Sequence, residues 1–340
     1  MRYKQVVKFF EVIVLTTAAA CRKEQNARSD LRAQDNYGIR SSLCYHNIPQ
    51  VCGGILRFDS WSQYQQIYDC LESEQEAYID SFISAHSNLS EEEYNDLADS
   101  IGFNDAQTLI DFENFQGFDS YRRVQADYED QWLAAGADPS TNPDQDNSFD
   151  DEIEETLRSE DGAIWIDSTI YLTDVNGDSW VIPGGSCEAL DSILSGLGNP
   201  LYKVLYNDGS TQCKNHQVDY LHLYYNDSNR MMAYKLRWNY WGGSTRTVAK
   251  MKMYRRKVVW RRNRTRIGVK VNGDYGIYSS DKCDFMGTYA KVKEPKRRRS
   301  RRVSQNWSDG EKTFESGKAQ ALYLFPNSSG PSDLIHKFEY

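Results

Sequence analysis

The sequence lacks several features that would assign it quickly to a class. After residue 20 it has no apolar run approaching roughly 18 residues, so it contains no internal membrane-spanning helix. Cysteine occurs only 7 times in 340 residues, which excludes a small disulfide-based scaffold. Aromatic residues, in contrast, reach 13 %, and disordered chains lack them. We therefore expect one to three globular domains.

The motifs that reveal common enzymes are also absent. The sequence has no Gly-x-Ser-x-Gly elbow, P-loop, His-Glu-x-x-His or Rossmann glycine pattern. A pair of carboxylates could hydrolyse glycosides, but among 49 acidic residues no pair stands out. The sequence therefore assigns no catalytic residue, and a non-enzymatic role is favoured.

Two segments partly match metal sites. Asp174–Asp178 has the first three ligand positions of a calcium loop, but Ser179 and Gly185 replace the glycine and glutamate that the loop needs. An Asn-Gly hairpin turn explains this segment better. Cys213, His216 and His222 are potential zinc ligands in the C-terminal half. A zinc site of the strong type needs two pairs of ligands, and no second pair lies near these residues in the sequence. The sequence predicts no metal and no cofactor.

Charge is distributed very unevenly along the chain. The formal net charge is −9, yet residues 230–302 hold 23 Lys+Arg and 4 Asp+Glu, whereas residues 54–160 hold 27 Asp+Glu and four Arg. Each half therefore projects a field of one sign. Either the two halves neutralise each other within the molecule, or the basic half binds an external polyanion.

Two basic runs are the candidate polyanion-binding residues. The first alternates cations with strand-forming residues, and the second reads as an exposed loop. Their cations are Arg255, Arg256, Lys257, Arg261, Arg262, Arg264, Arg266, Lys296, Arg297, Arg298, Arg299, Arg301 and Arg302. Nearby aromatic residues could stack on bases or sugar rings, or belong to the core: Trp238, Tyr240, Trp241, Tyr254 and Trp260.

The first 21 residues are typical of an export signal. Arg2, Lys4 and Lys8 precede the short apolar stretch Phe9–Thr17, and small residues then lead directly to Cys21. This end resembles the lipobox of bacterial lipoproteins, in which the chain is cut before the cysteine and that cysteine is acylated. Cys21 would then carry the lipid.

Six cysteines remain when Cys21 is set aside. An oxidising compartment would permit up to three disulfides, with fifteen connectivities among which the sequence does not choose. Cys44 and Cys52 are the closest pair in sequence and the candidate disulfide. Reduced, buried cysteines are the alternative.

Hydrophobic periodicity divides the chain into parts. Residues 1–20 are the expected signal peptide and 21–53 a tether. Residues 54–136 show helical spacing, with capping boxes at Ser60/Gln63 and Ser90/Glu93. Residues 137–160 are predicted to form a solvated acidic linker, because they are polar and negatively charged.

Residues 161–340 alternate with a period of two and predict a basic, mainly antiparallel β domain, either a sandwich or a partly closed sheet. Asn-Gly pairs at 176–177 and 272–273 each suggest a hairpin turn, and Gly185–Leu197 suggests one short helix. The predicted fold class is therefore α+β, with an acidic helical region before the β domain.

With these parts in place, the chain resembles uncharacterised exported lipoproteins of Bacteroidota. The resemblance depends on Ala18–Cys21, on the helix start Phe58–Tyr64, and on Gly117–Arg122 leading to Glu129. It implies a location, lipid-anchored to the cell envelope and at the outer rather than the inner membrane. It implies no activity.

The sequence thus favours a lipid-anchored envelope protein with a non-enzymatic binding or scaffolding role. Its partners would be the membrane and an anionic glycan, lipopolysaccharide or another envelope protein. One alternative is a hydrolase that acts on envelope or other glycans through carboxylates. A second alternative, a nucleic-acid-binding protein, requires that the N-terminus is not cleaved.

Overall fold

The computed structural model describes residues 44, 47–145, 147–173, 178–197, 202–204, 217–224, 229–241, 244–279, 282–307, 320–324 and 333–337. The predicted signal, Cys21, Cys213 and His216 lie outside the described residues, as does the turn at 174–177. The helices are α2 (Trp61–Ala85), α3 (Glu91–Ile101), α4 (Gln107–Gln116), α5 (Tyr121–Ala134), the 3₁₀ helix η1 (Pro139–Thr141), α6 (Glu152–Thr156) and α7 (Cys187–Leu194).

The strands form three sheets, and the predicted α+β class is confirmed. The first, mixed sheet has the order β1-β2-β3-β4-β5-β6, made of β1 (Gln50–Val51), β2 (Ile55–Phe58), β3 (Ala163–Ile166), β4 (Thr169–Thr173), β5 (Ser179–Pro183) and β6 (Lys203–Val204). The second has the order β10-β9-β8-β7 with β13 also on β9, made of β7 (Gln217–Tyr224), β8 (Arg230–Trp241), β9 (Ser244–Arg256), β10 (Trp260–Arg262) and β13 (Ser300–Trp307). The third has the order β12-β11-β14-β15, made of β11 (Thr265–Ser279), β12 (Lys282–Arg298), β14 (Gln320–Leu324) and β15 (Asp333–Lys337).

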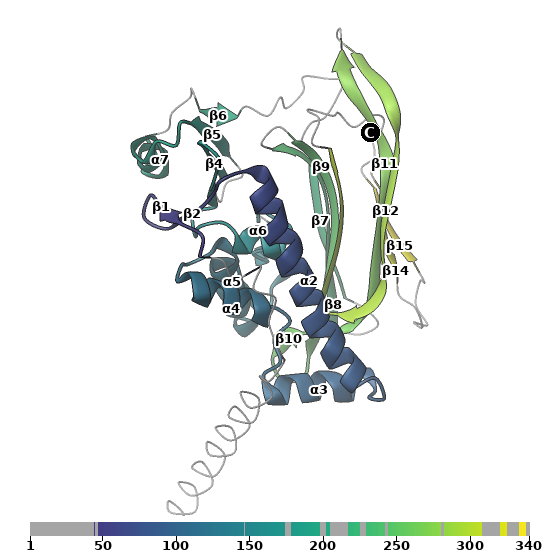
Figure 1. The fold of residues 1–340 in the computed structure, drawn as a ribbon. Coiled ribbons are helices and arrows are strands. Elements are labelled where there is room, and N and C mark those ends of the chain that lie inside the picture. Colours follow the sequence, from purple (N-terminus) through teal and green to yellow (C-terminus); the bar gives the residue numbers. More distant parts are fainter. Residues whose placement is uncertain are drawn as a thin grey trace, which may run out of the picture.

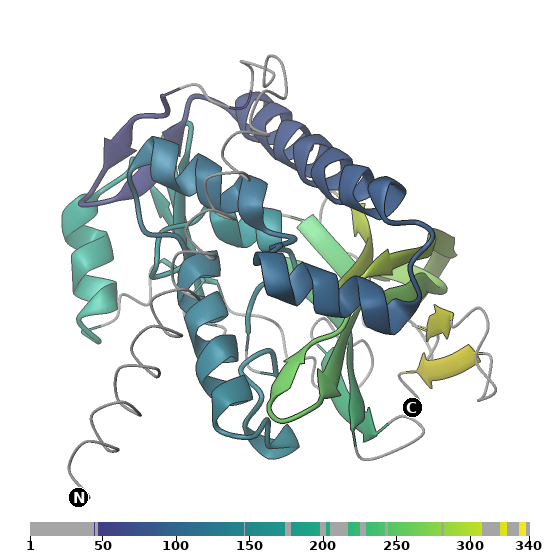
Figure 2. The ribbon, with the colours of Figure 1, turned by 90° about the horizontal axis from the view of Figure 1, so that it is seen from below.

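The sheets of β7–β9 and β11–β12, together with the helices, form three layers. Figure 1 shows the β7–β9 sheet and the β11–β12 sheet standing face to face, with the helices gathered on the free side of the β7–β9 sheet. The view from below in Figure 2 shows the same separation of helices from the long strands. The two sheets are joined by a core to which β8, β9, β11, β12 and β13 all contribute.

Local sequence determines the helix ends. Ser60 caps α2 by accepting from the Gln63 amide, and the Gln63 side chain accepts from the Asp59 amide. Ser90 and Glu93 form the predicted reciprocal capping box of α3. Gly102 then ends α3 with φ of 70°, a left-handed conformation that favours glycine. The short helix expected after Gly185 is α7.

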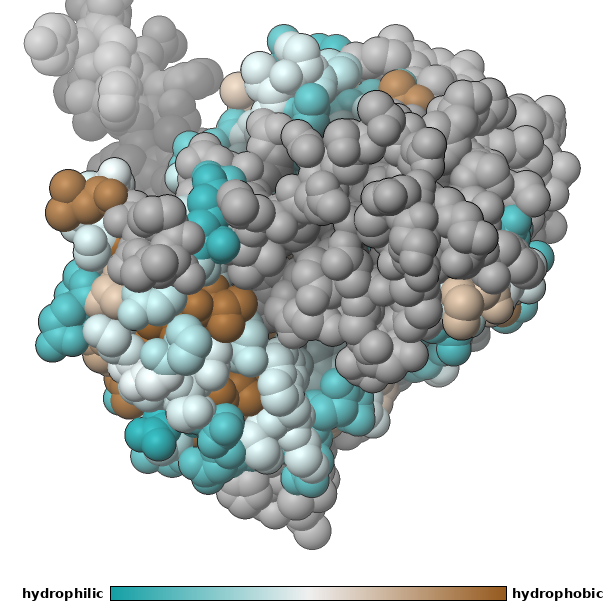
Figure 3. Space-filling model, turned by 90° about the horizontal axis from the view of Figure 1, so that it is seen from above, coloured by the Kyte–Doolittle hydropathy of each residue, from teal (hydrophilic) through white to brown (hydrophobic). Residues whose placement is uncertain are grey.

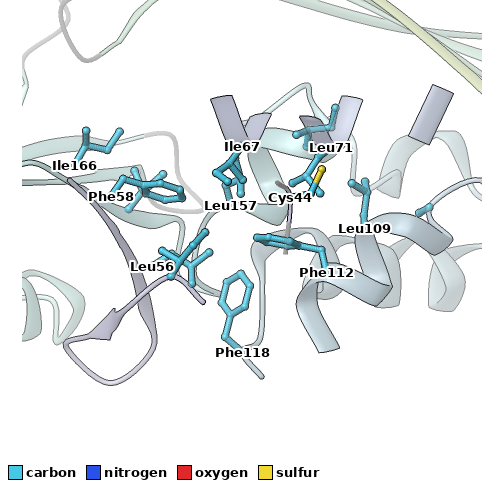
Figure 4. Close-up of a cluster of buried hydrophobic side chains, with 14 residues drawn as sticks. Cys44, Leu56, Phe58, Ile67, Leu71, Leu109, Phe112, Phe118, Leu157 and Ile166 are labelled. Atoms are coloured by element: carbon cyan, nitrogen blue, oxygen red, sulfur yellow. The ribbon is translucent and has the colours of Figure 1, made fainter. Parts of the chain in front are cut away.

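The mixed sheet has a hydrophobic core on each face, one beneath α2 and α4 and the other beneath α7. Leu56 and Phe58 point toward α2 and α4, where they meet Leu71 and Phe112 (Figure 4). Ile55, which directly precedes Leu56, points to the other face and packs beneath α7. This alternation of neighbouring residues between two cores is the consequence of the two-residue period of a strand.

The predicted pairing of Cys44 with Cys52 is wrong. Cys44 is bonded to Cys70 on α2, and Cys52 is bonded to Cys187 at the start of α7. Cys44 packs in the core beneath α2, whereas Cys52 packs against the core beneath α7. The sheet therefore separates the two cysteines that are closest in sequence.

One predicted turn is also corrected. At the first Asn-Gly pair, β4 and β5 form the expected antiparallel hairpin arms. At the second, Asn272 and Gly273 lie inside the continuous strand β11. Asn272 is paired with Ala290 on one side and with Gln320 on the other, so pairing on both edges holds the backbone extended.

The expected solvated linker is mostly buried. Within 137–160, Phe149, Ile153 and Leu157 belong to the interior, and so do acidic side chains such as Asp144 and Asp150. Ile153 and Leu157, four residues apart at α6, pack in the core beneath α2, whereas Phe149 precedes the helix. Residues 137–160, called the acidic segment below, run between the helices and the β7–β9 sheet. Cations of that sheet form ion pairs with the segment's acidic side chains.

The surface of the described part carries apolar side chains in separate patches. Figure 3 shows brown patches among hydrophilic residues on the side of α7, where Leu194 and Leu197 are exposed. Within the described residues, no helix is long and apolar enough to cross a membrane.

Candidate functional site: a charged cavity between helices and strands

The central strands place apolar residues on one face and cations on the other. On β9, Ala249, Met251 and Met253 face the sheet of β11 and β12. Lys250 and Lys252, between them, face the acidic segment and the helices. β8 repeats the pattern, with its cations Lys235 and Arg237 buried on the helical side. A basic layer therefore lines the interface with the acidic half.

The predicted polyanion-binding residues mostly contact this molecule's own acidic half. Among the described residues, ten of the thirteen form ion pairs with it: Arg255, Lys257, Arg261, Arg262, Arg264, Lys296, Arg298, Arg299, Arg301 and Arg302. Arg297 stacks on the Tyr94 ring at 4.5 Å, while Arg256 and Arg266 are exposed. Of the two explanations for the uneven charge, mutual neutralisation describes these residues.

The second basic run is not the exposed loop that the sequence suggests. Its residues end β12 and begin β13, and they lie against α2. Arg298 is buried and reaches both Glu76 and Asp80 at 2.7 Å. The ion pairs that these cations form with the acidic side chains of α2 outweigh the hydration that the cations would have in an exposed loop.

Two of the predicted stacking aromatics are interior residues. Tyr254 and Trp260 are buried, and the Tyr254 hydroxyl donates to Glu129 Oε1 at 2.8 Å. The side chains of Trp238, Tyr240 and Trp241 lie outside those that the structure describes. The described aromatics of these strands therefore stabilise the core rather than form an open platform.

A cavity of about 340 Å³ lies within the interface between the two halves. Helices α4 and α5, the acidic segment with α6, and strands β9 and β10 all contribute to its wall. Eight of its charged lining residues are called the inner group below: Glu129, Asp144, Glu152, Glu155, Lys250, Lys252, Arg262 and Arg299. Arg122, Arg123, Asp127 and Asp130 also line it. Apolar residues also line it: Ala106, Ile110, Ala126 and Pro143.

Three of the four inner carboxylates are held by cations. Lys252 Nζ lies 3.6 Å from Glu129 and 3.2 Å from Asp144, so one ammonium bridges two acids. Burial alone would raise the pKa of each of these carboxyls. The neighbouring cations outweigh burial and hold the pKa values of Glu129 and Asp144 far below their usual range. Arg299, 2.7 Å from Glu152, lowers the pKa of that carboxyl in the same way.

Glu155 behaves differently from its neighbours. It is 3 % exposed, and among the described residues its one hydrogen bond comes from the Asn147 amide at 2.8 Å. Burial raises the pKa of Glu155 to about 8, because neither Lys250 nor Lys252 pairs with it directly. Near neutral pH the cavity therefore contains one protonated carboxyl beside three ionised ones.

A second polar group lies behind the cavity wall. The Asn142 side-chain oxygen accepts from the Asp144 amide, so its nitrogen faces His222 Nε2 at 2.9 Å. Nε2 must then accept, which requires the neutral imidazole. Burial lowers the pKa of His222, and the opposing field of Asp144 does not overcome this effect.

The sequence pointed to none of the inner acids individually. The 49 acidic residues are too many for one to stand out. One signal was available. Phe149, Ile153 and Leu157 recur every four residues within the densest acidic run, and such a stripe indicates a buried rather than a solvated segment.

The geometry offers no available metal site at the closest group of potential ligands among the described residues. One group of potential ligands in the described part of the chain lies close together, Cys44, Cys70 and Glu74. Its two sulfur atoms are bonded to each other, so they are not available as thiolates.

Comparison with known proteins adds little to this description. No family model matches the chain, and no curated protein matches it. The chain is weakly similar to the crystal structure of a DUF4848 family protein from Bacteroides thetaiotaomicron. That similarity covers 85 % of this chain and 98 % of the other, at 10 % identity and a TM-score of 0.21. The match is to an uncharacterised Bacteroidota protein, and at this TM-score it supports no functional argument.

Proposed function

We propose that this protein is a lipid-anchored envelope protein that binds a small polar ligand in the charged cavity without transforming it. The cavity volume falls at the lower end of the range of small-molecule sites. The observation that carries the proposal is Glu155, a buried carboxyl on the cavity wall that lacks an ion-pair partner among the described residues. Besides the bond from Asn147, this carboxyl has hydrogen-bonding capacity that a polar ligand in the cavity could use.

This proposal replaces polyanion binding by the two basic runs. Because their cations are neutralised by α2, α3 and α5, a long anionic polymer would have to displace existing ion pairs. A small ligand in the cavity displaces none of them. Export and acylation at Cys21 remain part of the proposal and are supported by the signal-like N-terminus.

The test is a binding screen with a cavity-filling variant. Purified protein is screened by thermal shift against neutral sugars, sugar acids, amino sugars and amino acids, and hits are measured by calorimetry. Ala126→Phe places a ring in the cavity, and Ala134→Phe, on the exposed side of the same helix, is its matched control. We expect a ligand that binds the native protein and Ala134→Phe but not Ala126→Phe. Equal binding by all three proteins would refute the cavity as the site.

A glycoside hydrolase is the second candidate, and a specific arrangement favours it. Glu152 and Glu155 lie three residues apart on α6 and both line the cavity, one ionised and the other protonated at neutral pH. Water would add across the glycosidic C–O bond. Glu155 would give its proton to the leaving oxygen while Glu152 takes a proton from the attacking water.

Chromogenic aryl glycosides test this second candidate. Turnover that is lost in both Glu152→Gln and Glu155→Gln, with unchanged folding, would establish hydrolysis. Turnover that survives both substitutions would show that these carboxyls are not the catalysts. Binding of an intact glycoside with no turnover would leave the non-enzymatic role in place.

A further inference from the structure

With Glu155 protonated, the inner group of the cavity holds three carboxylates and four cations, and each cation contacts at least one of those carboxylates. Lys250 contacts Asp144 at 3.1 Å, and Arg262 contacts Glu129 at 2.8 Å. Arg299 contacts Glu152 at 2.7 Å. Each inner cation is therefore within ion-pair distance of an acid that also lines the cavity. The inner group therefore offers strong donors and acceptors side by side, and its cations are already in contact with carboxylates.

A charged ligand fits such a wall poorly. An anion would approach Glu129, Asp144 and Glu152, whose carboxylates already hold the cations that it would need. A cation would approach Lys250 and Lys252, which already hold the carboxylates. In either case the ligand would lose its hydration without gaining an unpaired partner of opposite sign.

Neutral hydroxyl groups fit the same wall well. A hydroxyl donates one hydrogen bond and accepts others, so it can bridge a carboxylate and an ammonium without disturbing their pairing. The carboxyl of Glu155 adds a group that can donate to a ligand oxygen as well as accept. Ala106, Ile110 and Ala126 supply a small apolar surface for the carbon skeleton.

We infer that the cavity takes a neutral, polyhydroxylated ligand, of the chemical class of a sugar, and that the Glu155 carboxyl hydrogen-bonds one of its oxygens. This inference rests on the proposed binding function and specifies its ligand. Glu155 is the group that selects the ligand, because the other inner carboxylates accept but cannot donate.

The experiment compares ligands that share a ring and differ in charge. Calorimetry at pH 7 measures glucose, galactose, mannose and N-acetylglucosamine, each beside the corresponding uronic acid or free amino sugar where one exists. We expect the best neutral sugar to bind at least about tenfold more tightly than its charged counterparts, a difference of about 1.4 kcal/mol. Tighter binding of a charged counterpart would overturn the ligand class.

Two variants test the role of Glu155. Glu155→Gln keeps a donor and an acceptor and should bind the neutral sugar within about threefold of the native protein, whereas Glu155→Leu should lose about tenfold or more. The native protein should also bind more weakly at pH 9.5 than at pH 7, because an ionised carboxyl no longer donates. Glu155→Gln should lack this dependence. If its binding is equally pH-dependent, Glu155 is not the selecting group.

These outcomes separate the inference from the function on which it rests. Binding of a charged compound that Ala126→Phe abolishes would keep the cavity as a binding site and overturn the sugar class. Failure of every compound in the screen to bind, or binding unaffected by Ala126→Phe, would overturn both.

Discussion

The buried group around Asp150 allows a sharp test of how the two halves are held together. Asp150 belongs to the acidic segment and is 1 % exposed. It contacts Lys235 at 3.2 Å and Arg237 at 3.1 Å, both on β8 and both buried. Asp150→Asn keeps the shape of the side chain and removes its charge. Two buried cations are then left without their shared counter-ion.

The magnitude follows from the burial of all three groups. Removing one partner of a buried ion pair typically destabilises a protein by about 3–5 kcal/mol, because the remaining charge stays desolvated. Here the cations keep other acceptors. Lys235 donates to the carbonyls of Asp144 and Asn147, and Arg237 donates to those of Asn147 and Ser148. We therefore expect about 3 kcal/mol, the lower end of that range.

Urea unfolding followed by tryptophan fluorescence, with the disulfides intact, measures this loss of unfolding free energy. Glu72→Gln is the matched control, since its pair with Lys293 is about half exposed on both sides and should change stability by less than about 1 kcal/mol. If Asp150→Asn costs no more than Glu72→Gln, the buried pairs do not hold the halves together. A changed m-value with an unchanged midpoint would point instead to altered compactness.

Three further predictions concern other parts of the molecule. Replacing Cys44 and Cys70 together by serine should lower unfolding free energy by about 3 kcal/mol in urea titrations, and non-reducing peptide mapping should recover this pair rather than Cys44–Cys52. His222 is held neutral in the fold, so below about pH 6.5 the unfolded chain binds more protons than the folded one, and the unfolding free energy should fall as the pH drops. His222→Asn should flatten this dependence of unfolding free energy on pH. An unchanged dependence would contradict the role of His222. Intact mass of protein from its native membrane should show an acylated chain that begins at Cys21; an uncut chain would favour nucleic-acid binding instead.

Much of the fold could be predicted because it depends on short-range patterns. The caps at Ser60 and Ser90, the helical spacing that follows them, and the alternation on β9 are all properties of neighbouring residues. The predictions that failed required knowledge of distant partners. Asn272 is a turn-forming residue that became part of a strand, because strands on both sides pair with it.

The candidate site shows the same division. The two-residue period of residues 161–340 was visible in the sequence, and it places Lys250 and Lys252, two residues apart on β9, on the same face. What lies opposite that face was not visible, because Asp144 is more than a hundred residues away and belongs to a segment that looks solvated in isolation. Composition gave the two halves opposite charge, but it could not say whether those charges face water or each other.

The sequence alone thus determined the α+β class, the starts of α2 and α3, the two-residue period of the strands and the opposite charges of the two halves. Only the tertiary structure decided that the cations of β8 and β9 face the acidic segment and that a cavity remains between them. It also decided that Glu155 lies there with no ion pair among the residues that the structure describes. Local backbone preferences act between neighbours, whereas the desolvation and pairing of charges depend on groups that the chain brings together only when it folds.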